Sequence, residues 1–272
     1  MLRYRVPAST TNLAHGFDCL GMALGLFNTI TVEPGGTTVT APGAADDGLA
    51  RFASEVRDLC TSTWGIAVPG FAVTVQGEVP IARGLGSSST IILGVAAACQ
   101  QVAGRPFDRV ELIRLGAVIE GHPDNVAAAA LGGFVVVGEI DGELRCQRFD
   151  PPAGVTCEVI IPDFEVKTVE ARRVLPGTLS KADHVRGLQH TALIVAALAR
   201  GDIDGLRGCF TGGWHEQHRA ALNPHLHGLR QSSDPHVIGT FLSGSGSTVI
   251  RLRREPFADG VRPDADGLQR LA

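Results

Sequence analysis

The amino-acid sequence predicts a protein of mixed helices and strands, folded as one large domain or two small ones. Residues 71–76 alternate apolar and polar side chains, as a half-buried strand does. Residues 91–102 are rich in Ala, Ile and Gln and lack proline, which favours a helix. With 272 residues the chain is long enough to bury a large core. A Pro-Pro-Ala-Gly sequence marks the expected boundary between residues 1–151 and residues 152–272.

The first elements alternate between extended and polar segments. A short strand is expected to begin over residues 3–6, and Pro7 is expected either to end it or to place it at a sheet edge. Residues 7–21 are polar and rich in turn formers, and they are too many for a hairpin loop, so we expect a functional loop. A strand follows at residues 30–32, and residues 49–60 carry apolar side chains at the spacing of an amphipathic helix.

Local signals also mark the later elements. Asp108 and Glu111 have the spacing of a capping box, which predicts a helix from there to about residue 119. Asp141-Gly142 between apolar runs predicts a hairpin turn. The remaining expected elements are strands at 134–137 and 155–161, a helical segment within 163–175, a helix at 182–198, and two strands around a glycine loop at 241–250. That loop either closes over a ligand or forms a simple hairpin.

Composition excludes several classes of protein. The formal net charge of −4 argues against broad binding to nucleic acid or to anionic membranes. The most apolar run, residues 126–137, is too short to span a bilayer. Six cysteines without a C-x-x-C pair suit reduced thiols better than a disulfide framework or a zinc site. The N-terminus lacks the apolar region of a secretory signal, so we expect a cytoplasmic protein.

Residues 80–90, with the sequence PIARGLGSSST, place glycines and hydroxyl groups at the start of a predicted helix. The first N–H groups of a helix have no intrahelical partner, and the helix dipole adds partial positive charge there. Gly84 and Gly86 would let the backbone approach an anion closely, and phosphate fits such a site best. Ser87 to Ser89 would add donors, and one hydroxyl could ligate a metal. The alternative is that the serines only cap the helix.

Polar side chains gather at three further places. Glu120 could hold Mg²⁺, and His122, Asp124 and Asn125 follow it closely. The alternatives are a solvated carboxylate, a structural histidine and a helix cap. Asn12 and Asp18 could contact a polar ligand, or they could simply satisfy turns. Thr168 and Arg172 could share one helical face, which would meet either a carboxylate or phosphate group or only water. Residues 214–219 add polar groups, but their two histidines do not form the H-E-x-x-H zinc motif.

These segments together resemble the homoserine kinases of the GHMP small-molecule kinase superfamily. Residues 7–21 resemble the N-terminal P-A-T-S-A-N-L-G-P-G-F-D-x-L-G motif, and residues 80–90 resemble the phosphate motif P-x-x-x-G-L-G-S-S. Residues 120–133 resemble E-G-H-P-D-N-V-A-P-A-x-x-G-G. Residues 167–176 resemble T-K-E-A-R-x-x-L-P, and residues 242–249 resemble L-S-G-x-G-P-T-V. The motifs occur in the family's order, although Ala14-His15 replaces the usual Gly-Pro.

The resemblance implies an α+β fold with two domains, the first with a mixed sheet and helices and the second with an antiparallel sheet backed by helices. It implies phosphorylation of L-homoserine by ATP with Mg²⁺, in threonine biosynthesis, with homoserine and ATP as small-molecule partners. The sequence does not determine the oligomeric state, and a homodimer is the assembly to test. The ATP phosphates would bind to residues in and beside the glycine loop: Pro80, Arg83, Gly84, Leu85, Gly86, Ser87, Ser88 and Ser89.

The resemblance also assigns roles around the second substrate. Ser88 and Glu120 would hold Mg²⁺. Asn125 and Arg172 would take part in catalysis. Asn125 lies in a region where other superfamily members use an aspartate base, so we expect no strong side-chain base and expect positioning to dominate. The amino-acid pocket would be lined by Asn12, Asp18, His122, Thr168, Arg172 and Arg219.

Two alternatives to homoserine kinase are left open. The chain could be a related kinase for another small hydroxy amino acid or alcohol, because its substrate-loop residues depart from the family motif. It could also be a kinase-fold protein that binds a metabolite without catalysis. The intact glycine-serine loop and Glu120 argue against the second alternative, since a protein without catalysis needs no magnesium ligand.

Overall fold

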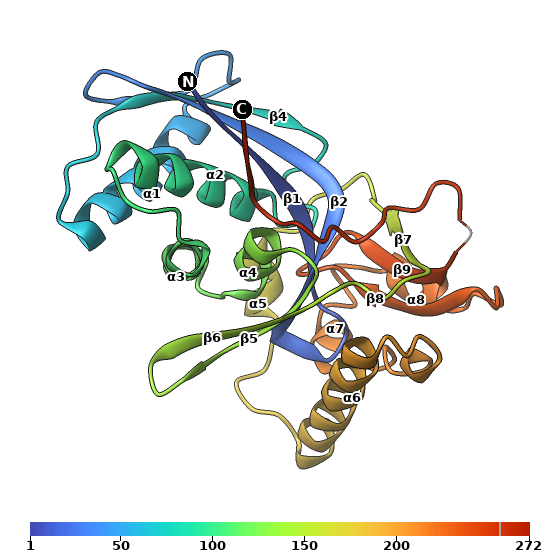
Figure 1. The fold of residues 1–272 in the computed structure, drawn as a ribbon. Coiled ribbons are helices and arrows are strands. Elements are labelled where there is room, and N and C mark those ends of the chain that lie inside the picture. Colours follow the sequence, from blue (N-terminus) through green and yellow to red (C-terminus); the bar gives the residue numbers. More distant parts are fainter. Residues whose placement is uncertain (256) are drawn as a thin grey trace.

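The computed structural model describes residues 1–255 and 257–272, and two sheets organise this part of the chain (Figure 1). The first sheet has seven strands in the order β10-β1-β2-β4-β3, with β5 paired to β2 and β6 paired to β5. Its strand pairs are antiparallel except for β3 and β4, which are parallel. The strands are β1 (Leu2–Asn12), β2 (Gly16–Pro34), β3 (Val39–Thr40), β4 (Phe71–Gly77), β5 (Phe134–Ile140), β6 (Glu143–Phe149) and β10 (Gln269–Leu271).

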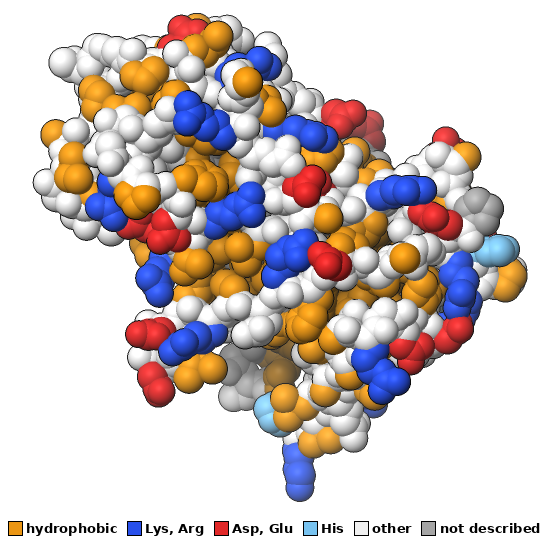
Figure 2. Space-filling model, viewed as in Figure 1, with side chains coloured by type: hydrophobic (Ala, Val, Ile, Leu, Met, Phe, Trp, Pro, Cys, Tyr) orange, Lys and Arg blue, Asp and Glu red, His pale blue; other side chains and the backbone are white. Residues whose placement is uncertain are grey.

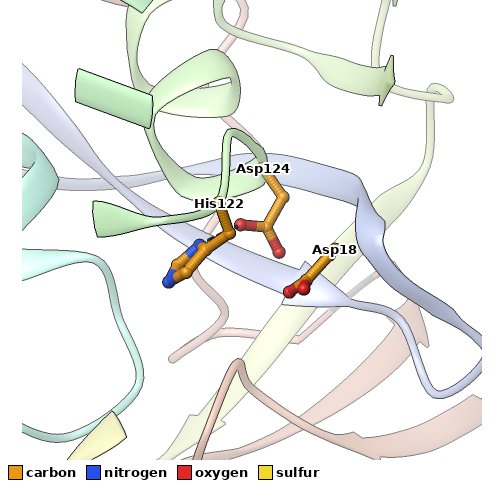
Figure 3. A group of neighbouring side chains, drawn as sticks. All are labelled: Asp18, His122 and Asp124. Atoms are coloured by element: carbon orange, nitrogen blue, oxygen red, sulfur yellow. Dashed lines mark hydrogen bonds and ion pairs between the residues drawn. The ribbon is translucent and has the colours of Figure 1, made fainter. Parts of the chain in front are cut away.

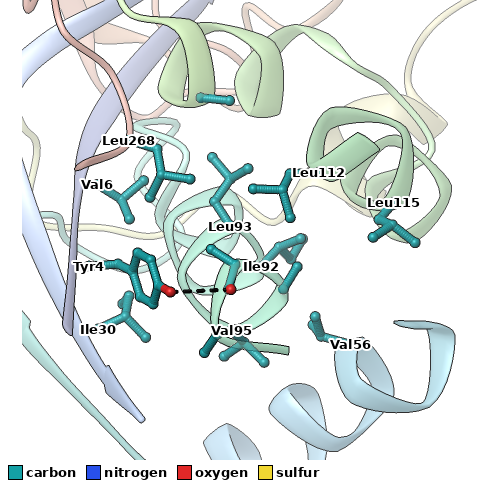
Figure 4. Packing of buried hydrophobic residues seen from close by; sticks show 14 of the residues in the cluster. Tyr4, Val6, Ile30, Val56, Ile92, Leu93, Val95, Leu112, Leu115 and Leu268 are labelled. Atoms are coloured by element: carbon teal, nitrogen blue, oxygen red, sulfur yellow. Dashed lines mark hydrogen bonds between the residues drawn. The ribbon is translucent and has the colours of Figure 1, made fainter. Parts of the chain in front are cut away.

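Four helices cover one face of this sheet (Figure 1). They are α1 (Gly48–Trp64), α2 (Ser87–Val102), α3 (Arg109–Glu120) and α4 (Asp124–Leu131). Helix α2 is buried along most of its length and lies at the centre of the packing. The hydroxyl of Tyr4 on β1 donates to the Ala97 carbonyl of α2 over 3.2 Å (Figure 4). Buried aliphatic side chains surround this contact, so α2 is fixed against the sheet beyond its midpoint.

The second sheet is smaller and antiparallel, with the order β7-β9-β8. Its strands are β7 (Val155–Ile160), β8 (Val237–Leu242) and β9 (Val249–Arg254). The accompanying helices are α5 (Thr168–Arg173), α6 (Lys181–Arg200), α7 (Trp214–His218) and α8 (His225–Arg230), with a 3₁₀ turn at Asp204–Leu206. The α+β fold with one mixed and one antiparallel sheet is therefore confirmed.

The β1–β2 hairpin belongs to two hydrophobic cores. Its open end contributes Tyr4 and Ile30 to the core under α1–α4. Its closed end contributes Leu20 and Leu24 to a second core, which also contains side chains of β7, β8, β9 and α6. The end of the chain returns to the first sheet, because β10 pairs with β1. The predicted division at residue 151 falls between β6 and β7 and stays a prediction.

The expected loop at residues 7–21 is wrong. The strand β1 continues through Pro7 to Asn12, and a tight turn at residues 13–15 connects it to β2. Pro7 is tolerated because the pairing with β10 covers only Arg3 to Arg5, and because the β1–β2 register shifts between Pro7 and Ala8. A proline without an N–H group is accommodated at such a bulge.

Other local predictions are confirmed. The helix predicted to follow Asp108 is present as α3, and the Asp108 carboxylate accepts hydrogen bonds from the N–H groups of Val110 and Glu111. The reciprocal half of the capping box does not form, because the Asp108 N–H donates to Gln100. Asp141 and Gly142 form the β5–β6 turn with positive φ angles of 56° and 77°. On the face shown in Figure 2, acidic and basic side chains are interspersed. Within the described ranges, the helices are each too short or too polar to cross a bilayer.

Candidate active site

A cleft of about 830 Å³ lies where the two parts of the fold meet. Its walls come from the start of α1, β4, the start of α2, the α3–α4 connection, α5 and the β8–β9 loop. Of the site residues predicted from the sequence, Pro80 and Ser89 lie outside the lining. The other predicted residues line the cleft: Asn12, Asp18, Arg83, Gly84, Leu85, Gly86, Ser87, Ser88, Glu120, His122, Asn125, Thr168, Arg172 and Arg219.

The glycines before α2 have left-handed backbone conformations, with φ of 75° at Gly84 and 68° at Gly86. A Cβ atom on Gly84 would collide with the backbone carbonyl of Ser243 in the β8–β9 loop. A Cβ atom on Gly86 would collide with the Ser9 hydroxyl and lie 3.1 Å from Oδ1 of Asn125. Glycine is therefore required at both positions because neighbouring segments leave no room for a side chain. The sequence had suggested a different reason, namely that glycine lets the backbone come close to a bound anion.

The serines of α2 do not cap the helix in the way that the alternative interpretation proposed. Gly86 occupies the N-cap position, and no side chain accepts from the first N–H groups of the helix. Ser87 and Ser89 are buried, whereas Ser88 is exposed to the cleft. The start of α2 thus presents unpaired N–H groups and the cleft-facing hydroxyl of Ser88, which is an arrangement suited to phosphate.

Glu120, the last residue of α3, lies opposite this helix start. The Ser88 hydroxyl donates to Oε1 of Glu120 over 2.5 Å, and the Ser89 hydroxyl donates to Oε2 over 2.8 Å. Burial raises the pKa of the Glu120 carboxyl, although the Ser88 and Ser89 hydrogen bonds and the His122 charge act in the opposite direction. A carboxylate and a hydroxyl beside a phosphate-binding helix are hard oxygen ligands, so the residues present fit Mg²⁺.

Two predicted substrate residues bind each other across the cleft. The Arg172 guanidinium of α5 donates to both carboxylate oxygens of Asp18, over 2.6 and 3.0 Å. Each side chain is about one third exposed, so the pair is open to the cleft. A zwitterionic ligand could exchange this internal ion pair for two pairs of its own.

Arg219 follows α7 and is almost fully buried. Its Nε donates to the Ala171 carbonyl and its Nη1 donates to the Gly244 carbonyl. Burial, together with the Arg172 charge, lowers the pKa of Arg219 to about 10. At neutral pH it therefore remains a cation held by backbone carbonyl groups, which leaves its charge available to an anionic ligand.

His122 and Asp124 form a pair beside Asp18 (Figure 3). The distance from Nδ1 of His122 to the Asp124 carboxylate is 2.7 Å, and Asp124 is buried. Burial alone would lower the pKa of His122, but the hydrogen bond to Asp124 and the charges of Asp124 and Glu120 raise it overall. The three side chains lie close enough for a cation, but Asp18 and His122 already have partners.

Asn12 and Asn125 have defined partners within the protein. The Asn12 amide donates to the Gly244 carbonyl and accepts from the N–H of Asp18. The Asn125 carbonyl accepts from the Ser9 hydroxyl over 2.9 Å. Both side chains line the cleft, so each amide holds neighbouring segments together and is also accessible to a ligand. Thr168, the first residue of α5, is exposed at the rim.

Sequence reasoning missed Phe17 and did not include Asp124 among the site residues. The Phe17 ring lies 5.3 Å from the Arg172 Cζ and 5.4 Å from the Arg219 Cζ. Local sequence could not indicate this contact, because one arginine lies in α5 and the other directly follows α7, far along the chain. The other end of the cleft, beyond Ser87, is lined by apolar side chains, which sequence reasoning had not assigned: Leu49, Phe52, Val75, Val79, Ile81 and Ile91.

Known proteins resemble this chain over most of its length. Residues 50–133 match the family model described as the GHMP kinases N terminal domain. The homoserine kinase of Deinococcus radiodurans is 38% identical over 252 residues, covering 90% of this chain and 82% of that protein. The homoserine kinase of Desulfitobacterium hafniense is 34% identical over 268 residues, covering 96% and 90%.

A solved structure has the same fold. The crystal structure of homoserine kinase from Cytophaga hutchinsonii superimposes with a TM-score of 0.84, covering 99% of this chain and 97% of that one. Its sequence identity of 23% makes this a likeness of fold alone.

Proposed function

The chain belongs to the homoserine kinase family of the GHMP kinases, and we propose that it transfers the γ-phosphoryl group of ATP directly to the side-chain hydroxyl of L-homoserine. Within this family the protein is an ATP-dependent small-molecule kinase. Its product would be O-phospho-L-homoserine, a precursor in threonine biosynthesis. A cytoplasmic location and a homodimer stay predictions, which fractionation and sedimentation equilibrium would test.

In the proposal, ATP occupies the half of the cleft that contains the start of α2. The phosphates would accept from the unpaired N–H groups of the first turn and from Ser88. Arg83, whose ion pair with Glu165 is 3.4 Å long, would add positive charge. The apolar end near Leu49 and Phe52 would receive the base, because a flat aromatic ring gains from apolar contact.

Mg²⁺ would bind to Glu120 and Ser88, and the ion would neutralise phosphate charge when bound. Ser89 would hold the second carboxylate oxygen of Glu120 and so orient the carboxylate. This role follows from the oxygen atoms that converge at the start of α2.

The amino-acid substrate would lie between Asp18 and the two arginines. Asp18 would accept from the ammonium group, while Arg172 and Arg219 would donate to the carboxylate. Asn12, His122 and Thr168 would line the rest of the pocket. The hydroxyl would then point toward the helix start.

Catalysis would depend on positioning. Asn125 lies beside both Gly86 and the substrate half of the cleft, so its amide would orient the attacking hydroxyl. The new bond would form between the hydroxyl oxygen and the γ-phosphorus as the bond to ADP breaks, with the hydroxyl proton released to water. Arg172 would stabilise charge on the transferred group. No side chain need act as a strong base, because charge neutralisation and alignment carry most of this reaction.

The observation that carries the proposal is one cleft holding both a helix start with unpaired N–H groups and a facing Asp18–Arg172 pair. ADP release measured with L-homoserine, L-serine, L-threonine and mevalonate would test it. Turnover that depends on homoserine supports the proposal. Turnover with another alcohol would favour a related kinase, and none with any alcohol would favour a metabolite-binding protein.

A further inference from the structure

Arg219 commits only part of its hydrogen-bonding capacity to the protein. A guanidinium group has five N–H donors. The Nε hydrogen is bonded to Ala171, and the two Nη1 partners are the Gly244 carbonyl, at 3.0 Å, and Nδ1 of His215, at 3.0 Å. Nη2 has no hydrogen-bond partner among the described residues. Because Arg219 lines the cleft, this amino group is the part that a ligand can use.

The contact with His215 determines the state of the imidazole. Nη1 of Arg219 can only donate, so Nδ1 of His215 must accept and carry no proton. The ring is therefore neutral and carries its hydrogen on Nε2, which is buried and has no hydrogen-bond partner among the described residues. Complete burial and the Arg219 charge also lower the pKa of His215 well below its ordinary value, with the Ala14 carbonyl acting in the opposite direction.

Neighbouring aromatic groups hold the imidazole in place. Helix α7 packs beside the β1–β2 turn, where the Phe17 ring lies 5.4 Å from the His215 ring (Figure 1). The Trp214 ring contacts both Phe17 and His215. His215 is itself fully buried and does not line the cleft, so it reaches the cleft through two residues that do, Arg219 and Phe17.

We propose that His215 is a positioning residue, which holds Nη1 of Arg219 so that Nη2 faces the carboxylate of the substrate. This inference rests on the proposed function, since it assigns the group that Arg219 contacts. Without the acceptor at Nδ1, one Nη1 hydrogen would be buried and unpaired, and the guanidinium would rotate toward another partner.

Steady-state kinetics of His215→Asn and His215→Leu would test this role. The Asn side-chain carbonyl can accept where Nδ1 does, whereas Leu fills similar space without an acceptor. We expect His215→Leu to raise KM for L-homoserine about tenfold, with KM for ATP unchanged, and His215→Asn to stay within about twofold of the wild type. His218→Leu, an exposed position on the same helix, is the matched control and should behave as the wild type.

Equal impairment of the Asn and Leu variants would overturn the proposal, because the effect would then be packing alone. An unchanged KM in His215→Leu would also overturn it. If His215→Leu does not fold, long-range ¹⁵N–¹H spectra of the wild type decide: an unprotonated Nδ1 supports the proposal and a protonated Nδ1 refutes it. A wild type that does not phosphorylate homoserine would defeat the proposed function, while the tautomer would still test the Arg219–His215 contact.

Discussion

At the scale of single residues, Phe17 brings two positive charges to one aromatic ring. The faces of an aromatic ring attract cations, and each such contact contributes about 0.5–1 kcal/mol at a partly exposed site. Arg172 and Arg219 repel each other, and this repulsion helps to lower the pKa of Arg219. The ring therefore offsets part of the cost of holding both guanidinium groups near one carboxylate.

Replacing Phe17 with Leu should raise KM for the amino-acid substrate about fivefold, because the apolar volume remains while the cation contacts are lost. Steady-state kinetics at saturating ATP measures this. Phe107→Leu is the control, since Phe107 is exposed and its arginine contact lies outside the cleft. A similar change in both variants would rule out the specific role of Phe17.

Gly86→Ala should abolish most activity, because the added Cβ atom would collide with Ser9 and crowd Asn125. The positive φ angle at this position is also unfavourable for alanine. The backbone strain alone costs about 1–2 kcal/mol. Gly104→Ala has nearly the same φ, 67°, but open space around the added atom, so it should lose stability and keep activity. Thermal unfolding and ADP release of the two variants would separate strain from collision. Equal activity in both would contradict the packing role of Gly86.

The sequence correctly indicated that Gly84 and Gly86 are positions where a side chain is not tolerated, but it could not show which atoms exclude the side chain. A motif shows where a side chain is excluded, and the atoms that exclude it come from Ser9, Asn125 and the β8–β9 loop. The same limit applies to Asp18, whose partner Arg172 lies 154 positions away. Ala14 has a positive φ of 65° where the family motif has glycine, which local propensity would not suggest.

At the scale of elements, α3 begins at a strong capping signal and ends at the proposed magnesium ligand. Asp108 caps its first turn, and Glu120 is its last residue. Capping signals act over three residues, so the sequence located this helix well. The β1–β2 hairpin was not predicted, because the interactions that form it are not local in sequence. Its long pairing and its bulge at Pro7 depend on partners in distant strands and in two cores.

Asp108→Ala should lower the free energy of unfolding by about 1 kcal/mol, because two N–H groups at the start of α3 lose their acceptor. Urea denaturation measures the change. Asp47→Ala is the matched control, since Asp47 precedes α1 without capping it through its side chain, and it should cost less than about 0.5 kcal/mol. Equal losses would show that Asp108 does not act as a cap.

At the scale of the whole molecule, buried histidines should make stability depend on pH. The pKa values of His15 and His215 are lowered, chiefly by burial, so the unfolded chain binds more protons below the ordinary pKa of 6.5. Their contribution to stability is present above that pH and is lost as the pH falls. His122 has a raised pKa and acts in the opposite direction, its contribution being lost as the pH rises.

His215→Asn should therefore lose less stability than the wild type between pH 7 and pH 5. The difference in slope approaches about 1.4 kcal/mol per pH unit for one proton. Urea denaturation at a series of pH values measures it. Parallel curves for the two proteins would mean that His215 titrates alike in the folded and unfolded states.

The β1–β2 hairpin joins the two cores and carries Asn12, Phe17 and Asp18 to the cleft. In the proposed function, substrate binding would therefore engage both halves of the fold. The central claim is that this cleft brings ATP and homoserine together for direct transfer. ³¹P NMR of a reaction with ATP, Mg²⁺ and L-homoserine tests that claim most directly. We expect a phosphomonoester signal coupled to the γ-methylene protons of homoserine, equal in amount to the ADP formed. ADP accompanied only by inorganic phosphate, or no ADP at all, would contradict it.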